Sequence, residues 1–148
     1  MKLNLGSGND YRDDCINVDV NKEGSCDVVV DLENDNLPWK DGEIDEIVAH
    51  MILEHIIKRD RLMNECWRVL KPGGKIDITV PMGGTVADFK DPTHISHWIP
   101  ETFRYYCDWN TCPANQRKTW EMIRCERDLI GDENEFVSCI LKKPDEYS

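Results

Sequence analysis

Short apolar runs separated by polar, turn-forming segments dominate the first half of the chain. Runs of this length that are rich in β-branched residues predict strands. The run DVVVDL is continuous, which is typical of a strand that is buried on both faces. Near the C-terminus two further runs flank the segment GDENE and predict an antiparallel hairpin. The pattern predicts strands at residues 3–5, 16–20, 27–32, 44–49, 76–80, 120–127 and 136–141.

A helical period appears between the fourth and fifth of these runs. In RDRLMNECWRVL (residues 59–70) apolar side chains recur at steps of three and four residues. Asp60 is placed to cap the start of this helix. The Lys-Pro-Gly-Gly segment at 71–74 ends the helix and predicts a turn with Pro second and Gly third. Strand, helix and strand form a βαβ unit, so this part of the sheet is predicted to be parallel.

The other connections are less regular. Residues 83–98 predict a long loop, and Pro100 favours a short helix that follows it. Residues 6–15 and 21–26 leave no room for crossover helices. Residues 21–26 span roughly 20 Å when they are extended. We therefore favour parallel pairing of the strands at 16–20 and 27–32 over a hairpin. We therefore expect one α/β domain over residues 1–148, with a mostly parallel sheet, a C-terminal antiparallel hairpin and early crossover helices that are shortened or absent.

Composition narrows the function classes. Hydrophobic residues make up 40% and charged residues 32% of the chain, which is typical of a globular protein. No apolar run approaches the roughly 18 residues of a membrane span, and MKLNLGSG is too short and polar for a signal peptide. We therefore expect a cytoplasmic protein with no membrane contact. A net charge of −11 disfavours nucleic acid as a partner.

The seven cysteines are an odd number, which indicates reduced thiols rather than a disulfide framework. A zinc site would need ligands with tight spacing, usually a C-x-x-C pair. The cysteines available for such a site lack that pair, so we interpret them as small buried side chains: Cys107, Cys112, Cys125 and Cys139.

The segment LNLGSGND (residues 3–10) follows the first predicted strand. Its glycines let the backbone turn sharply and let a ligand approach the amides. A dinucleotide fingerprint needs a third glycine where Tyr11 stands, which disfavours NAD. Asp19 ends the second predicted strand and can accept ribose hydroxyls, and Asp31 ends the third and can accept an adenine amine. Together with the loop they predict an adenosine site.

At this point the sequence resembles the class I S-adenosylmethionine-dependent methyltransferases, and in particular a small branch with LEH and RVLKPGG segments. The resemblance implies a minimal Rossmann-like methyltransferase domain that binds S-adenosylmethionine and releases S-adenosylhomocysteine. It covers most of residues 3–103, and the order and spacing within 31–81 are its most specific part. The matching pieces are LNLGSGN, INVDV, VVVDLENDNLPWKDGEIDEIVAHMILEHI, ECWRVLKPGGKIDITVP and DPTHISHWIPETF.

The resemblance also implies which residues contact the cofactor. The glycine loop would hold the methionine part of the cofactor. The ends of the second and third strands would bind the ribose and the adenine, and the segment after the fourth strand would line the sulfonium end. The implied residues are Leu5, Gly6, Ser7, Gly8, Asn9, Asp19, Val20, Asp31, Leu32, Ala49, His50, Met51 and Glu54.

The chain departs from the family in its helices. A helix before the first strand and another after the glycine loop are usual in the family, and both look absent here. One face of the sheet would then lack cover. A homodimer partner or the C-terminal segment would supply that cover.

Methyl transfer places little covalent chemistry on the protein, because the cofactor's methyl group is already activated. The protein must orient the acceptor and, for a hydroxyl acceptor, provide a base. Candidate bases are His55, His94 and His97. Asp91, His94 and His97 have a spacing that suits a metal site, but we favour a lid over the substrate pocket and expect no metal. The lid would include Trp98, Phe103, Tyr105 and Tyr106.

The sequence therefore predicts a methyltransferase acting on a small-molecule or glycan hydroxyl. The alternative is an S-adenosylmethionine-binding module without transferase activity, either regulatory or part of a larger assembly.

Overall fold

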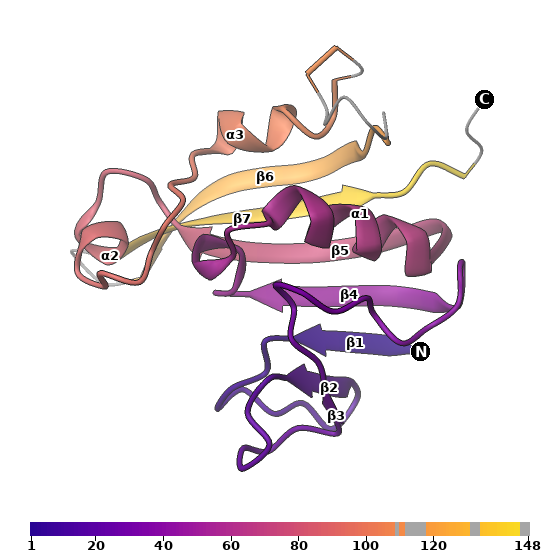
Figure 1. Cartoon of the computed structure of the whole chain (residues 1–148). Coiled ribbons are helices and arrows are strands. Elements are labelled where there is room, and N and C mark those ends of the chain that lie inside the picture. Colours follow the sequence, from indigo (N-terminus) through magenta and orange to yellow (C-terminus); the bar gives the residue numbers. More distant parts are fainter. Residues whose placement is uncertain (109, 112–117, 131–133, 146–148) are drawn as a thin grey trace.

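The computed structural model describes residues 1–108, 110–111, 118–130 and 134–145. Its centre is a seven-stranded sheet with the order β3-β2-β1-β4-β5-β7-β6 (Figure 1). A short 3-10 turn, η1 (Leu53–His55), and the helices α1 (Arg59–Val69), α2 (Val86–Phe89) and α3 (Pro100–Arg104) accompany the sheet. The strands are β1 (Lys2–Leu5), β2 (Ile16–Asp19), β3 (Val28–Val29), β4 (Ile44–His50), β5 (Leu70–Pro81), β6 (Glu121–Ile130) and β7 (Asn134–Lys142).

Strands β3, β2, β1, β4 and β5 run parallel to one another. Strand β7 is antiparallel to both β5 and β6. This confirms the predicted α/β class, the parallel β2–β3 pair and the C-terminal hairpin. Because parallel strands end at the same edge of a sheet, the segments that follow β1, β2, β3 and β4 are brought together there.

Helix α1 follows the predicted apolar period and buries one side against the sheet. It begins at Arg59, and its N-cap is Lys58 without a side-chain cap hydrogen bond. The prediction that Asp60 caps the helix was wrong, because Asp60 lies inside the first turn. Its carboxylate instead accepts a hydrogen bond of 2.7 Å from the hydroxyl of Tyr106.

The Lys-Pro-Gly-Gly segment forms a bulge within β5 rather than a separate connection. Ile44 pairs with Leu70 and Glu46 pairs with Lys75, so residues 71–74 oppose a single residue of β4. Gly73 has φ 81, as the third position of a type II turn requires.

Two other predicted elements differ in extent. Strand β3 covers only Val28–Val29, and Val29 is exposed because β3 lies at the edge of the sheet. The predicted burial of this strand on both faces was therefore wrong. The predicted loop at 83–98 contains α2, and the N-cap residue of this helix, Thr85, has an extended backbone conformation.

The residues between β1 and β2 form no helix, and a buried amide side chain organises them instead. Asn17 donates from Nδ2 to the carbonyl oxygens of Arg12 (2.9 Å) and Cys15 (3.2 Å). Its Oδ1 accepts from Asn4 Nδ2 (3.0 Å) and from the backbone N–H of Arg12 (2.9 Å). Asn17 therefore fixes this loop over the sheet, where a crossover helix would otherwise lie.

Arg68 of α1 has a similar role for the segment between β3 and β4. Its guanidinium donates to the carbonyl oxygens of Leu37 (2.9 Å) and Trp39 (2.8 Å) and to the carboxylates of Glu65 and Asp41. The Glu65 carboxylate is the main cause that raises the pKa of Arg68 above its usual value. These bonds hold the segment against α1 without a helix of its own.

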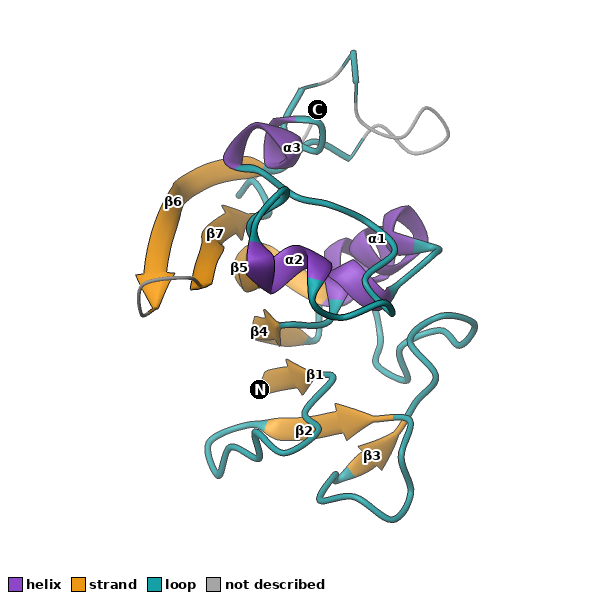
Figure 2. Ribbon diagram, turned by 90° about the vertical axis from the view of Figure 1, so that its left-hand side faces the viewer, coloured by secondary structure: helices purple, strands orange, loops and turns teal. Residues whose placement is uncertain are grey.

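The two faces of the sheet differ. Helix α1 lies over one face, as Figure 2 shows. The side chains of that face are apolar and buried. On the other face no helix of the described residues lies over β1 and β4 (Figure 2). The side chains there are mainly polar. No helix in the described part of the chain is both long enough and apolar enough to cross a membrane.

Candidate functional site

The loop after β1 has the conformation that its glycines permit. Gly6 has φ 65 and Gly8 has φ 48, a left-handed region that side chains rarely adopt. The N–H of Ser7 donates to the carbonyl of Val18 (3.1 Å), and the N–H of Gly8 donates to Asp19 Oδ2 (2.7 Å). The loop is therefore fixed directly against the end of β2.

The two glycines have different surroundings. A Cβ at Gly6 would lie 2.8 Å from side-chain atoms of Ile52, so the segment after β4 packs against this loop. A Cβ at Gly8 would meet only the Gly6 carbonyl oxygen, at 3.9 Å. The hydroxyl of Ser7 is buried and has no hydrogen-bond partner among the described residues. The loop thus offers open space at Gly8 and an unused polar group at Ser7.

Asp19 is the last residue of β2 and Asp31 follows β3, at the same edge of the sheet. Asp19 Oδ1 accepts from the N–H of Asn21 (3.0 Å), and Oδ2 accepts from Gly8 as described above. Asp31 accepts from Asn34 Nδ2 (2.8 Å) and from the N–H of Glu33 (2.9 Å), and these bonds lower its pKa. Since a carboxylate has about four acceptor positions, both groups keep the capacity to bind ligand hydroxyl or amine groups.

The remaining predicted cofactor residues lie beside these groups. Leu5 and Leu32 are buried, whereas Asn9 and Val20 are exposed. Ala49 is buried at the end of β4.

Beyond Ala49 the chain turns at a strained residue. His50 Nδ1 lies 3.0 Å from Arg12 Nη2, and its Nε2 lies 3.2 Å from Asp77 Oδ1. Met51 has φ 58, which is unusual for a residue other than glycine, and its N–H donates to the carbonyl of Thr79 (2.7 Å). Such strain is most often found at functional sites, which is consistent with a site at this edge.

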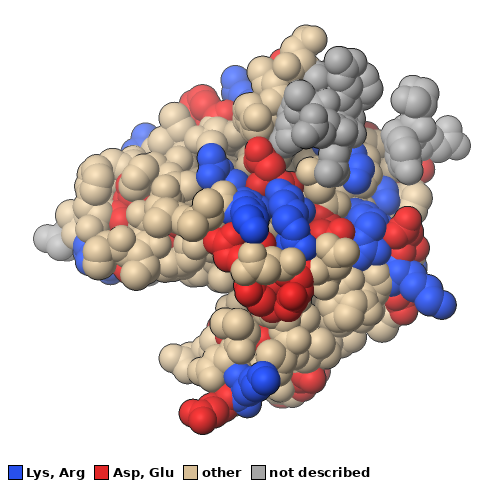
Figure 3. All heavy atoms as spheres, viewed as in Figure 1, with Lys and Arg blue, Asp and Glu red and all other residues tan. Residues whose placement is uncertain are grey.

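The molecular surface is indented at the same place. Figure 3 shows a hollow on its left side, between the part of the molecule that carries α2 and the part that carries β2 and β3. It corresponds to the edge where β1 and β4 end in Figure 1. The segments that follow β1 and β4 therefore border an open groove.

Three of the remaining predicted residues lie together at this edge. Glu54 and His55 lie in η1 directly after β4, and His94 lies in the segment after α2. Possible ligand atoms of Glu54, His55 and His94 all lie within 4.8 Å of one another. Glu54 is completely buried, and this burial raises the pKa of its carboxyl to about 7. The spacing in the sequence predicted that His94 and His97 lie together, but in the fold His94 lies next to His55.

His97 lies apart from that cluster in a pair with Asp88. Its Nδ1 lies 2.8 Å from Oδ2 and 2.9 Å from Oδ1 of Asp88, which is buried. The side chain of His97 is 55% exposed, so its other nitrogen is accessible to solvent. The sequence did not single out Asp88, and no motif would have identified it.

The predicted aromatic lid is mostly core. Trp98, Phe103 and Tyr106 are buried, with ring centroids 4.9 Å apart for Trp98–Phe103 and 6.1 Å apart for Trp98–Tyr106. Tyr105 is the exposed member of the group. For the three buried rings the lid prediction was wrong, because they pack in the hydrophobic core.

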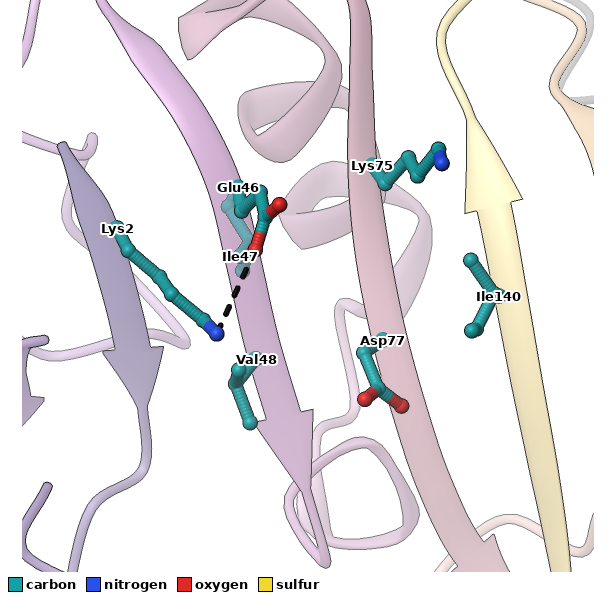
Figure 4. A pocket seen from close by; sticks show the side chains of 7 residues that line it. All are labelled: Lys2, Glu46, Ile47, Val48, Lys75, Asp77 and Ile140. Carbon is teal, nitrogen blue, oxygen red and sulfur yellow. Dashed lines mark ion pairs between the residues drawn. The ribbon is translucent and has the colours of Figure 1, made fainter. Parts of the chain in front are cut away.

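A shallow cavity of about 150 Å³ lies away from this edge, on the uncovered face of the sheet (Figure 4). It is lined by β1, β4, β5 and β7, and an ion pair between Lys2 and Glu46 crosses it. Small-molecule sites usually measure roughly 300–1,000 Å³, so this cavity is too small for a nucleoside cofactor.

The sequence predicted that the cysteines of the second half of the chain are small buried side chains rather than metal ligands, and Cys139 is buried whereas Cys107 and Cys125 are partly buried. Cys107, Cys125 and Cys139 are free thiols, and burial raises the pKa of each. Cys112 lies outside the described residues.

Comparison with known proteins agrees with the fold. A model of the methyltransferase domain family matches residues 8–78. A probable S-adenosylmethionine-dependent methyltransferase of Mycolicibacterium smegmatis is 32% identical over 65 residues, which are 42% of this chain. The matched part spans 25% of that relative.

Solved structures share the architecture over nearly the whole chain. A methyltransferase from Methanosarcina mazei is 16% identical with a TM-score of 0.70, covering 98% of this chain and 92% of the other. A methyltransferase from Archaeoglobus fulgidus is 17% identical with a TM-score of 0.68, covering 96% and 85%. At sequence identities this low, the similarity shows a shared fold only.

The site also suits the cofactor of these proteins, because the open space at Gly8, the unpaired Ser7 hydroxyl and the acceptor capacity of Asp19 fit a nucleoside with a charged amino-acid tail. The family match over residues 8–78, the strand order and the parallel strands that end at this groove show that this part of the chain is similar to the methyltransferase domain family.

Proposed function

We propose that the chain transfers the methyl group of S-adenosylmethionine to a hydroxyl group of a small molecule or a glycan. The observation that carries this proposal is the convergence of the glycine loop, Asp19, Asp31 and the segment after β4 at one edge of the sheet. A ligand in this groove would contact all four at once.

Each group has a role that its geometry supports. The carboxylate of Asp19 accepts the ribose hydroxyls, and Asp31 accepts the adenine amine. The open space at Gly8 receives the methionine tail, and the Ser7 hydroxyl, which has no partner among the described residues, donates to it. Bound S-adenosylmethionine supplies a methyl group that its sulfonium already activates. The protein then contributes orientation of the acceptor oxygen.

His97 is the base that we propose for the acceptor hydroxyl. Its Nδ1 is directed at the buried carboxylate of Asp88, which fixes the ring and leaves Nε2 free to accept a proton. A base that is oriented by a third group is the usual arrangement for activating a hydroxyl.

The class of acceptor follows from charge. The net charge of −11 opposes binding of a polyanion, which favours an uncharged or cationic acceptor over nucleic acid. The free thiols of the described cysteines are consistent with a reducing compartment, so we place the activity in the cytoplasm.

Isothermal titration with S-adenosylmethionine and S-adenosylhomocysteine tests the site. We expect Asp19→Ala to weaken binding by about 1–3 kcal/mol, the usual cost of losing hydrogen bonds to a charged group. Asp13→Ala is the matched control, because Asp13 is an exposed aspartate of the segment between β1 and β2. Equal affinity of Asp19→Ala and the wild type would disprove the assignment.

A second measurement separates an enzyme from a binding module. Methyl-labelled cofactor is incubated with the protein and with fractions of small molecules and glycans. Transfer of label that is reduced in His97→Gln supports the proposed enzyme. Cofactor binding without transfer to any fraction would favour a module without transferase activity.

A further inference from the structure

Glu54, His55 and His94 have an arrangement that methyl transfer alone does not require. They come from two segments that are far apart in the sequence, yet their ligand atoms lie within 4.8 Å of one another. The His55 and His94 rings are 4.8 Å apart between centroids and meet edge to face. The cluster follows directly after β4, beside the groove described above.

The hydrogen bonds of His94 fix its tautomer. Its Nδ1 lies 2.7 Å from the backbone carbonyl oxygen of Asp88. A carbonyl oxygen can only accept, so Nδ1 carries the hydrogen and Nε2 of the neutral ring has a free lone pair. The side chain is 5% exposed, so this lone pair is largely shielded from water.

His55 is fixed in the same way. Its Nδ1 lies 3.2 Å from the carbonyl oxygen and 3.1 Å from the hydroxyl of Thr93. That hydroxyl donates its own hydrogen to Asp91 Oδ1 (2.6 Å), so toward His55 it accepts. The Nε2 of the neutral His55 ring is therefore also a lone-pair donor, and it lies 3.6 Å from Glu54 Oε1.

Glu54 completes the cluster. It is fully buried, and neither carboxylate oxygen has a hydrogen-bond partner among the described residues. Buried polar groups almost always have a partner, and an unpaired buried carboxylate is costly. When Glu54 is ionised, a carboxylate and two imidazole lone pairs thus lie within 4.8 Å of one another with no hydrogen between them, and a cation placed among them would satisfy all three.

We propose that Glu54, His55 and His94 bind one divalent transition-metal ion, such as Zn²⁺, Mn²⁺ or Co²⁺. Two imidazoles and one carboxylate suit these ions. The Nδ1 bonds to backbone carbonyls are the support that metal-binding histidines usually have. Three protein ligands leave coordination positions open, as in catalytic sites. This proposal replaces the sequence-based expectation of no metal.

The open positions also suggest what the ion does. If the proposed function is correct, they receive oxygen atoms of the acceptor, because the site adjoins the groove for the cofactor. Asp91 Oδ2 lies 3.5 Å from His94 Nε2 and can accept a hydrogen bond from a bound water or hydroxyl. This role rests on the proposed function, whereas the metal site itself does not.

The test is a titration of the chelator-treated full chain with Zn²⁺, Mn²⁺ or Co²⁺ in the absence of cofactor, followed by calorimetry and by Co²⁺ absorption. We expect one ion per chain. Loss of outer-sphere support typically weakens metal binding by about 10–100-fold, so loss of a ligand in Glu54→Gln or His94→Ala should weaken it by more than about 100-fold.

His97→Gln is the matched control, because His97 is a neighbouring histidine that bonds to Asp88 and not to the cluster. It should keep the affinity of the wild type. Circular dichroism and thermal midpoints establish that each variant is folded. Absence of stoichiometric binding, or equal binding by wild type and Glu54→Gln, would overturn the metal site. Because no cofactor is present, either result is independent of whether S-adenosylmethionine binds.

Discussion

The two faces of the sheet achieve stability in different ways. The face beneath α1 carries apolar side chains such as Leu3, Ile47 and Ile78, all of them buried. The opposite face carries charged or polar side chains such as Lys2, Glu46 and Asp77 at the alternate positions. Alternation along each strand assigns the two sets to opposite sides, so this sheet can leave one side to solvent.

This difference changes how the missing helices should be understood. An exposed apolar face would require a partner subunit or a terminal segment to cover it. Here Lys2 pairs with Glu46 and Asp14, and Asp77 pairs with His50, which lowers the pKa of Asp77. A face of this kind is stable in water, so the lack of a helix between β1 and β2 does not by itself call for a homodimer.

The largest expected effect is on the covered face. Ile78→Ala removes a completely buried side chain from the centre of the sheet. Substitutions of this kind cost about 2–5 kcal/mol, because they lose transfer free energy and leave a cavity. Chemical denaturation would measure the loss of unfolding free energy. A cost below about 1 kcal/mol would contradict the proposed contrast between the faces.

Asn17→Ala is expected to have the next largest effect. It tests whether a polar network replaces a helix on the other face. The substitution removes the hydrogen bonds that Asn17 makes with the N–H of Arg12 and with the carbonyl of Cys15, and one of the two hydrogen bonds of Asn4 Nδ2. Unpaired buried groups cost about 1–3 kcal/mol, so we expect a loss in that range by denaturation. The exposed Asn21→Ala is the control and should change stability little. Equal effects of the two would show that the loop does not depend on Asn17.

Glu54→Gln should raise the unfolding free energy, whereas the two substitutions above lower it. Glu54 is a buried carboxylate without a hydrogen-bond partner in the described part of the chain, whereas the charges named above on the open face are paired. Replacing it with an uncharged amide should raise the unfolding free energy of the metal-free protein by about 1–2 kcal/mol at pH 8. The same variant should lose metal binding. A metal-free Glu54→Gln protein that is less stable than wild type would show that the carboxylate has a structural role.

The smallest effect is expected for the ion pair across the open face. Lys2 Nζ lies 3.4 Å from Glu46 Oε2, and Glu46 is largely exposed. A double-mutant cycle with Lys2→Met and Glu46→Gln should give a coupling free energy of about 0.2–1 kcal/mol, and added salt should reduce it. A larger, salt-independent coupling would mean that this face is shielded from water.

The sequence predicted the strands well because each is marked by local patterning. The apolar runs at 3–5, 44–49 and 76–80 are short, clear and bounded by turn residues, and each coincides with an observed strand. The position of Asp19 at the end of β2 could be predicted because the apolar pattern of that strand ends there. The error at Asp60 arose because a cap depends on where the first turn begins, and several neighbouring residues could begin it.

The groups around the groove were harder to predict. The sequence showed Asn17 only as part of INVDV and did not single out Asp88, because their side-chain hydrogen bonds to neighbouring loop residues exist only in the folded chain. His94 was paired with His97 because the two are three residues apart, but their rings bond to different groups. Sequence spacing indicates proximity only within a regular element, and this segment is not one.

The sequence alone determined the strands, the main helix, the glycine loop and the acidic residues that follow β2 and β3. These features depend on short-range periodicity and on turn chemistry, which can be seen in a few consecutive residues. Tertiary structure decided which face is covered, what replaces the missing helices and which histidines lie together with Glu54. Those outcomes depend on the crossing of segments that are many residues apart, because burial and hydrogen-bond partners exist only once the chain has folded.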